Sequence, residues 1–129
     1  MQQLIIDTNI LARLLVGNVR AQQIEAEKIL QQIESGKALG EISILVINEL
    51  IWVMEGYYKL DREIYFDKFQ TILGLRGITV KEMKKEDLVN IMIEFSSSKL
   101  DFTDLYLIRT KRPTQKIISF DKELLKHDL

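Results

Sequence analysis

The chain has 129 residues, of which 47% are hydrophobic and 29% charged, a composition that predicts one folded domain over residues 1–129 and excludes a disordered chain. It contains no cysteine, which excludes disulfides, thiolate metal sites and cysteine nucleophiles. Lys and Arg number 18 against 19 Asp and Glu, so the balance argues against nucleic-acid binding by the whole surface and leaves only a local basic patch.

The expected elements alternate between short strands and helices. Apolar residues spaced i, i+3, i+4 and i+7 predict the helices, and short apolar runs predict strands buried on both faces of a sheet. In chain order these are a strand over 4–6, a helix over 26–33, a strand over 39–42, helices over 50–57 and 65–73, a strand over 78–80, helices over 88–95 and 102–108, and a strand over 117–120. This alternation predicts an α/β fold with a mostly parallel sheet and leaves the strand order open.

No segment approaches the roughly 20 apolar residues of a membrane helix. The longest apolar stretch, 42–54, is interrupted by Ser43, Asn48 and Glu49, and the N-terminus has no basic region before Asp7. We therefore expect a cytoplasmic protein without a membrane segment.

Two carboxylates directly follow predicted strands. Asp7 comes after the strand over 4–6, and Asp121 comes after the strand over 117–120. Each is suited to cap the helix that follows, an interaction worth about 1 kcal/mol. If both strands are parallel, both carboxylates emerge at the carboxyl edge of the sheet, which is where open α/β sheets bind ligands.

Two further carboxylates lie within predicted helices. Glu49 lies on or beside an apolar stripe, where burial would require it to be neutral, paired or metal-bound; the alternative is an edge position that reaches water. Asp104 falls in the first turn of a helix that Asp101 is placed to cap, where it favours the helix dipole or remains ionised for a ligand.

Carboxylates that converge from distant segments repel one another, so we expect a divalent cation among them. Oxygen ligands with no cysteine and a single histidine favour Mg²⁺ or Mn²⁺ over zinc. A Mg²⁺ ion held by a few carboxylates typically acts on phosphate esters.

A basic stretch links two of these acids. Residues 105–120 contain no acid and four basic side chains, and a fifth, Arg13, follows Asp7 in another acid-free segment. The four are Arg109, Lys111, Arg112 and Lys116. They are weak candidates for binding a polyanion such as RNA, and the alternative is ordinary helix C-terminal charge that complements the dipole.

The motifs together resemble a known family. They are Asp7-Thr8-Asn9 after the first strand, Asn48-Glu49-Leu50 in the helix after the second strand, Asp101-Phe102-Thr103-Asp104 at the start of a late helix, and Ser119-Phe120-Asp121-Lys122 near the end. In this order and at these spacings, over the whole chain, they are similar to the PIN domain, and most to the VapC-type toxins of bacterial and archaeal toxin–antitoxin pairs. The chain departs from the family at Leu105-Tyr106-Leu107, where small residues are usual.

The resemblance implies a three-layer α/β/α fold and a Mg²⁺- or Mn²⁺-dependent endoribonuclease, a hydrolase of RNA phosphodiester bonds. It implies that Asp7, Glu49, Asp104 and Asp121 hold the metal and carry the chemistry, with Thr8, Asn9, Asp101 and Ser119 in support. The implied partners are an RNA substrate and a cognate antitoxin. Two alternatives stay open: a non-catalytic PIN-like module for RNA binding or assembly, and another Mg²⁺-dependent phosphate-transfer or phosphohydrolase domain.

A group of aromatic residues predicts a protein interface. The helices over 50–58 and 65–73 are apolar over wide arcs, and a small domain cannot be expected to cover all of that surface. We expect a second copy in a homodimer, or an antitoxin segment, to pack against one or more of Trp52, Tyr57, Tyr58, Tyr65 and Phe66.

Overall fold

The computed structural model describes residues 1–127 of the chain. Contacts within the chain divide it into two compact units, unit 1 (Met1–Val89) and unit 2 (Asn90–Leu129). The expectation of a single domain over 1–129 stays a prediction. None of the helices in the described part is long and apolar enough to cross a membrane.

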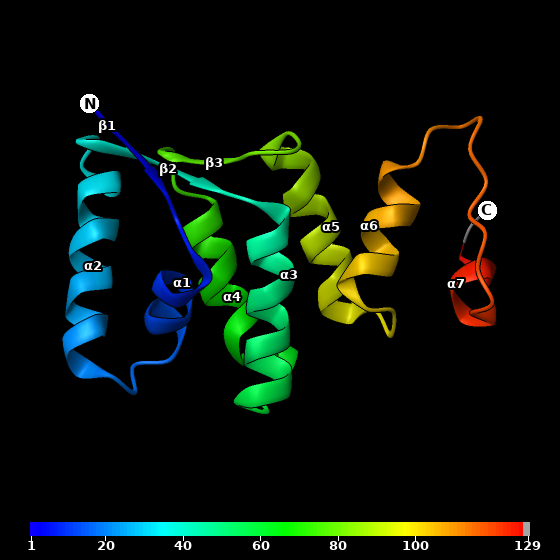
Figure 1. Cartoon of the computed structure of the whole chain (residues 1–129), viewed down its shortest axis with the longest axis horizontal. Helices are drawn as coiled ribbons and strands as arrows, with labels where there is room; N and C mark the ends of the chain where they lie inside the picture. Colours follow the sequence, from blue (N-terminus) through cyan, green and yellow to red (C-terminus); the bar gives the residue numbers. More distant parts are fainter. Residues whose placement is uncertain (128–129) are drawn as a thin grey trace. The chain divides into compact units, whose positions relative to one another are not determined.

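Unit 1 contains a small parallel sheet and the helices that pack on it (Figure 1). Its elements are β1 (Gln2–Ile5), α1 (Thr8–Leu15), α2 (Arg20–Glu34), β2 (Ala38–Ile42), α3 (Ile44–Trp52), the π-helical turn η1 (Val53–Tyr57), α4 (Arg62–Leu73) and β3 (Ile78–Val80). The helix α5 (Lys85–Ser97) runs from unit 1 into unit 2, which also holds α6 (Phe102–Thr110) and α7 (Lys122–Lys126). The predicted α/β class and the parallel sheet are confirmed.

The sheet has the order β1-β2-β3, and both neighbouring pairs are parallel. Figure 1 shows α1, α2, α3 and α4 on the same side of the strands. On that face Ile6 and Ile78 are buried, and a Cβ on Gly40 would come within 2.9 Å of Cδ1 of Ile33 in α2. Glycine at position 40 therefore lets α2 lie directly on the middle strand.

The opposite face of the sheet is open within unit 1. Ile5 is 85% exposed and Leu39 is 38% exposed, and Thr79 is also exposed. The expectation that the strands are buried on both faces is therefore wrong here. Successive side chains of a strand point to opposite faces, and α1 to α4 cover one face only. The second helical layer of a three-layer fold stays a prediction.

The strand expected over residues 117–120 is not formed. These residues lie in an irregular segment between α6 and α7, with Ile118 84% exposed and Phe120 fully exposed. A strand needs a neighbouring strand to satisfy its backbone N–H and C=O groups. An apolar run alone does not supply that neighbour, so this prediction was wrong.

The helical predictions are confirmed in position, and the structure extends them. The expected helix over 50–57 begins earlier, at Ile44, and changes into the π-helical turn at Val53. The apolar stripes of α4, α5 and α6 are buried as their spacing predicted: Tyr65, Phe69, Ile72, Leu73, Leu88, Ile91, Met92, Phe95, Phe102, Leu105 and Ile108.

The turn η1 sets a carboxylate against α4. Glu55 accepts hydrogen bonds from Nε of Arg62 at 2.8 Å and Nη2 at 3.1 Å, and from the hydroxyl of Tyr65. Partial burial raises the pKa of the Glu55 carboxyl, but these bonds from Arg62 and Tyr65 outweigh it and lower the pKa below its ordinary value. Through Glu55, the π-helical turn at the end of α3 is thus bonded to the following helix α4.

Candidate functional site

Asp7 occupies the first helix-capping position at the carboxyl edge of the sheet. It follows β1 and has the extended backbone of an N-cap residue, with φ −87° and ψ 164°. Its side chain is exposed and makes no capping hydrogen bond to α1. The expected stabilisation of α1 by a side-chain cap at Asp7, worth about 1 kcal/mol, is therefore absent.

The next residue, Thr8, carries an unsatisfied polar atom. Thr8 is only 3% exposed, and its hydroxyl oxygen is buried without a hydrogen-bond partner in the structure. Buried hydroxyls are nearly always bonded to protein or ordered water, so an unbonded one beside an uncommitted carboxylate points to a missing ligand or water. Asn9, the third residue of the motif, is exposed.

A second acid lies at the same edge and was not among the predicted site residues. Glu82 is the second residue after β3, as Asp7 is the second residue after β1, and the strands are parallel. Its Oε2 accepts a 2.5 Å hydrogen bond from the hydroxyl of Ser43, and its Oε1 accepts a 2.9 Å bond from the backbone N–H of Ile44. The sequence signal that could have identified Glu82 is its position just after a predicted strand. It was missed because residues 81–87 are a run of mixed charges typical of a solvated surface.

The Glu82 carboxylate is hydrogen-bonded to the first residues of α3 and stabilises the start of this helix. Burial raises the pKa of its carboxyl, but the bonds from Ser43 and Ile44 outweigh this and lower it below the ordinary value. The side-chain oxygen of Ser43 accepts the N–H of Leu45 at 3.1 Å, so Ser43 is the N-cap of α3, the helix that carries Glu49.

Glu49 is exposed on α3. The interpretation that burial forces this carboxylate to find a partner is therefore wrong, because an exposed carboxylate is solvated at no cost. The alternative, an edge position that reaches water, is the one observed. The role of Glu49 as a metal ligand stays a prediction.

Unit 2 gathers three of the carboxylates. Asp101 is the N-cap of α6, and its Oδ1 accepts the N–H of Asp104 at 3.0 Å, which confirms its capping role. Partial burial, then the charges of Asp101 and Asp121 together with a hydrogen bond to Asp101, raise the pKa of the Asp104 carboxyl above its ordinary value. Asp104 is thus crowded by like charge from both sides.

Asp121 is also a helix cap. Its Oδ1 accepts the N–H of Glu123 at 2.9 Å and that of Leu124 at 3.3 Å, at the start of α7. Ser119 supports it, because the Ser119 hydroxyl oxygen accepts the N–H of Asp121 at 2.9 Å. The second oxygen of the Asp121 carboxylate is left outside these bonds.

No group of three His, Cys, Asp or Glu side chains within residues 1–127 is placed to hold a metal ion. The predicted set takes Asp7 and Glu49 from unit 1 and Asp104 and Asp121 from unit 2. Their convergence into one site stays a prediction.

Three of the basic side chains proposed for RNA already have protein partners. Arg13 donates to Gln22 at 2.7 Å, to Asn18 at 3.1 Å and to the hydroxyl of Tyr58 at 3.0 Å. Arg109 forms a two-point ion pair with Glu94, with N–O distances of 2.7 and 2.6 Å. The ammonium of Lys111 donates to the carbonyl of Gln115 at 3.0 Å. The predicted basic surface therefore narrows to Arg112 and Lys116.

No family model, curated protein or solved structure matches the chain. The resemblance to PIN domains rests on the motifs around Asp7, Glu49, Asp104 and Asp121 and stays a prediction.

Proposed function

We propose that the protein is an endoribonuclease that uses Mg²⁺ or Mn²⁺ to hydrolyse RNA phosphodiester bonds. The observation that carries this proposal is the environment of Asp104: partial burial, followed by repulsion from Asp101 and Asp121, raises the pKa of the Asp104 carboxyl. A bound divalent cation relieves such repulsion, and carboxylate oxygens are the ligands that Mg²⁺ prefers.

Asp7 and Thr8 support the same chemistry from unit 1. The Asp7 carboxylate is not used as a cap, and the Thr8 hydroxyl is buried without a partner. Both are hard oxygen donors, so they fit a Mg²⁺ ion or its water shell and do not fit a soft metal. In this proposal the cation is held by some of the four carboxylates Asp7, Glu49, Asp104 and Asp121, with Asn9, Asp101 and Ser119 in support.

The protein groups share the work of hydrolysis. A bound Mg²⁺ supplies positive charge to a phosphodiester oxygen and acidity to a water molecule. A carboxylate not used for the cation, Glu49 or Asp121, orients or deprotonates that water as a general base. Asp121 keeps one oxygen for this role while the other caps α7.

Cleavage of RNA by the purified chain tests the proposal. We expect cleavage with Mg²⁺, none with EDTA, and none in Asp104→Asn with Mg²⁺. Asp67→Asn is the matched control, because Asp67 is an exposed acid on α4 and its change should leave cleavage intact. Equal cleavage by wild type and Asp104→Asn, or cleavage unaffected by EDTA, contradicts the proposal.

A toxin of a toxin–antitoxin pair is the biological role that we propose for this activity. Induced expression of the wild type should arrest growth, expression of Asp104→Asn should not, and a co-expressed antitoxin should restore growth. Growth arrest by both forms alike would point to a non-enzymatic cause.

A non-catalytic PIN-like module for RNA binding or assembly is the second candidate. It is favoured by the observation that no group of three His, Cys, Asp or Glu side chains within residues 1–127 is placed to hold a metal ion. Such a module binds RNA without cleaving it in the presence of Mg²⁺, so the cleavage assay separates the two functions.

Exposed aromatic residues in unit 1 are the proposed contact for a partner. Trp52 is 68% exposed and Tyr57 is 71% exposed, whereas Tyr65 is buried at 2%. The ring of Tyr57 packs edge-on against Tyr58, with centroids 4.9 Å apart. We propose that Trp52 and Tyr57 contact a second copy in a homodimer or an antitoxin segment, since large exposed aromatic side chains are typical of interface cores.

A further inference from the structure

The segment after α6 folds into a closed turn. The N–H of Gln115 donates to the carbonyl of Arg112 at 2.9 Å, and the N–H of Arg112 donates to Oε1 of Gln115 at 2.7 Å. Pro113 stands in the second position of this turn, where its fixed φ is favoured. The ammonium of Lys111 donates to the carbonyl of Gln115 at 3.0 Å. These bonds hold the turn in one shape.

An open hollow of about 380 Å³ lies between this turn and the end of α6. Its size falls in the lower part of the range for small-molecule sites. The lining contains two lysines, polar and apolar side chains, and no carboxylate: Leu107, Thr110, Lys111, Gln115, Lys116, Ile117 and Ile118.

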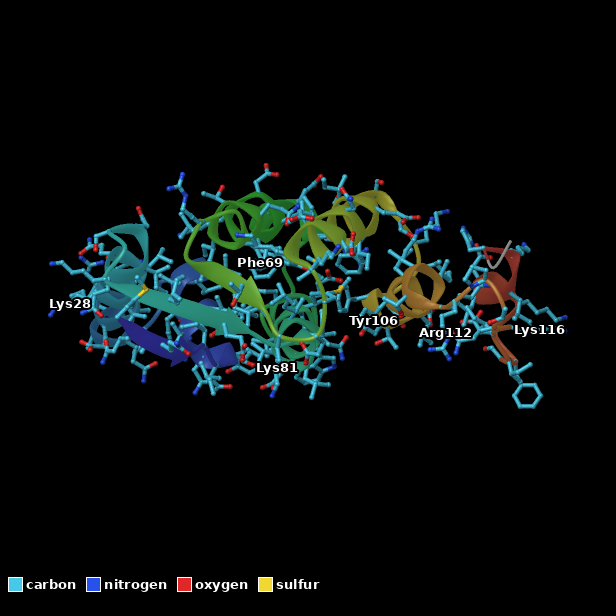
Figure 2. All side chains as sticks on the ribbon, turned by 90° about the horizontal axis from the view of Figure 1, so that it is seen from above. Lys28, Phe69, Lys81, Tyr106, Arg112 and Lys116 are labelled. Atoms are coloured by element: carbon cyan, nitrogen blue, oxygen red, sulfur yellow. The ribbon has the colours of Figure 1, made fainter. Side chains whose placement is uncertain are left out.

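The hollow has a positive side and an apolar side. Lys116 makes no hydrogen bond or ion pair with residues 1–127 and is exposed, and Arg112 is exposed beside the turn (Figure 2). Leu107 is 44% exposed and Ile118 is 84% exposed, so both offer apolar surface to a ligand. This combination suits a ligand that carries a negative charge next to an apolar group.

The end of α6 fixes where the negative charge binds. The C-terminal end of a helix is the negative end of its dipole, so an anion is disfavoured at Thr110 and favoured on the far side of the hollow, at Lys116. Arg109 contributes no charge here, because Glu94 neutralises it.

We propose that this hollow binds one nucleotide of a single-stranded RNA, with its phosphate at Lys116 and its base against Leu107 and Ile118. The proposal rests on the proposed function, because that function supplies RNA as the ligand. Leu107 and Thr110, which line the hollow, lie three and six residues after Asp104 on α6, or about 4.5 and 9 Å along the helix. The nucleotide in the hollow is therefore a neighbour of the one that is cleaved, and it positions the strand.

Binding of a short fluorescein-labelled single-stranded RNA tests the site by anisotropy. The full chain carries Asp104→Asn and the buffer contains EDTA, so that the RNA stays intact. We expect Lys116→Glu to weaken binding several-fold and to reduce the slope of log K against log salt by about 0.7, the value for one phosphate contact on a single strand. Lys116→Gln should weaken binding less, and Ile118→Ser should weaken it with the salt slope unchanged.

Lys28→Glu is the matched control. Lys28 is an exposed lysine on α2, in unit 1, and its reversal changes the net charge as Lys116→Glu does (Figure 2). If Lys116→Glu and Lys28→Glu bind RNA equally tightly, or if the chain binds no RNA, the nucleotide site is overturned. Lys116 is exposed and unbonded within residues 1–127, so circular dichroism of the variants should match the wild type.

The two proposals fail in different ways. If the wild-type chain cleaves RNA and Lys116→Glu has the same KM, the nucleotide site in the hollow is refuted and the nuclease proposal stands. If RNA binding depends on Lys116 and Ile118 but no RNA is cleaved with Mg²⁺, the nucleotide site stands and the nuclease proposal is refuted.

Discussion

Asp104→Asn distinguishes a ligand role from a structural role for the carboxylate in the first turn of α6. The change removes a charge and keeps the size of the side chain. Asp104 accepts no capping bond; its own N–H donates to Asp101 Oδ1, and that bond survives the substitution. The substitution therefore alters the electrostatic interactions of the Asp104 side chain and its hydrogen bond to Asp101.

Two opposing effects set the size of the change in stability. A negative charge in the first turn of a helix is worth about 0.3–1 kcal/mol through the helix dipole. Partial burial and repulsion from Asp101 and Asp121 act the other way and dominate, because the pKa of the Asp104 carboxyl is raised. The group is only partly buried, so solvent screening limits the net gain for Asp104→Asn to below about 1 kcal/mol.

The raised pKa also sets the sign of the pH dependence. A carboxyl with a higher pKa in the folded state binds more protons when folded, so its contribution to stability falls as pH rises through the unfolded and then the folded pKa. Asp104→Asn removes this contribution, and its advantage over wild type should be present at pH 7 and vanish near pH 3.

Urea unfolding followed by circular dichroism, in EDTA at pH 7, measures the effect. We expect Asp104→Asn to be as stable as wild type or slightly more stable. Asp101→Ala, which removes the cap of the same helix, should cost about 1 kcal/mol. Added Mg²⁺ should stabilise the wild type, by about 2.7 kcal/mol when the Mg²⁺ concentration is 100 times its Kd. It should stabilise Asp104→Asn less. A loss of more than about 1 kcal/mol in Asp104→Asn would refute the reasoning, since the carboxylate would then be structural.

Three further outcomes follow from the packing of unit 1. Gly77→Ala should cost about 1–3 kcal/mol in urea unfolding, because its Cβ would lie 2.8 Å from Cγ2 of Ile33 and 3.2 Å from the carbonyl oxygen of Ile33; an unchanged midpoint would contradict this. Glu55→Gln should destabilise the chain at pH 7 by breaking the ion pair with Arg62; because the pKa of Glu55 is lowered, the difference from wild type should shrink as the pH falls below about 4.5, and a difference independent of pH in urea titrations would count against it. Trp52→Ser should shift sedimentation toward the monomer or abolish antitoxin binding, and an unchanged assembly in both assays would remove Trp52 from the interface.

Local sequence signals were sufficient for the five expected helices and for the caps at Asp101 and Asp121, although not for Asp7, which makes no capping bond. Ser43 and Asp101 cap α3 and α6 through bonds to backbone groups two and three residues away, so the short sequence around each contains the whole interaction. The strand over Ile78–Val80 was likewise predicted at its observed bounds, because the glycine before it and the charged residues after it mark its ends.

Tertiary structure decided which element packs against each apolar side chain and which carboxylates form hydrogen bonds to other segments. Ile5, Ile118 and Phe120 are as apolar as the core, yet they are exposed, because the spacing of apolar residues defines a face and does not identify the element that packs on it. The same limit applies to the acids. Glu82 and Asp7 both lie two residues beyond a strand, but Glu82 accepts a hydrogen bond from Ser43 whereas Asp7 makes no capping bond to α1, since hydrogen bonds between distant segments depend on how the strands pair.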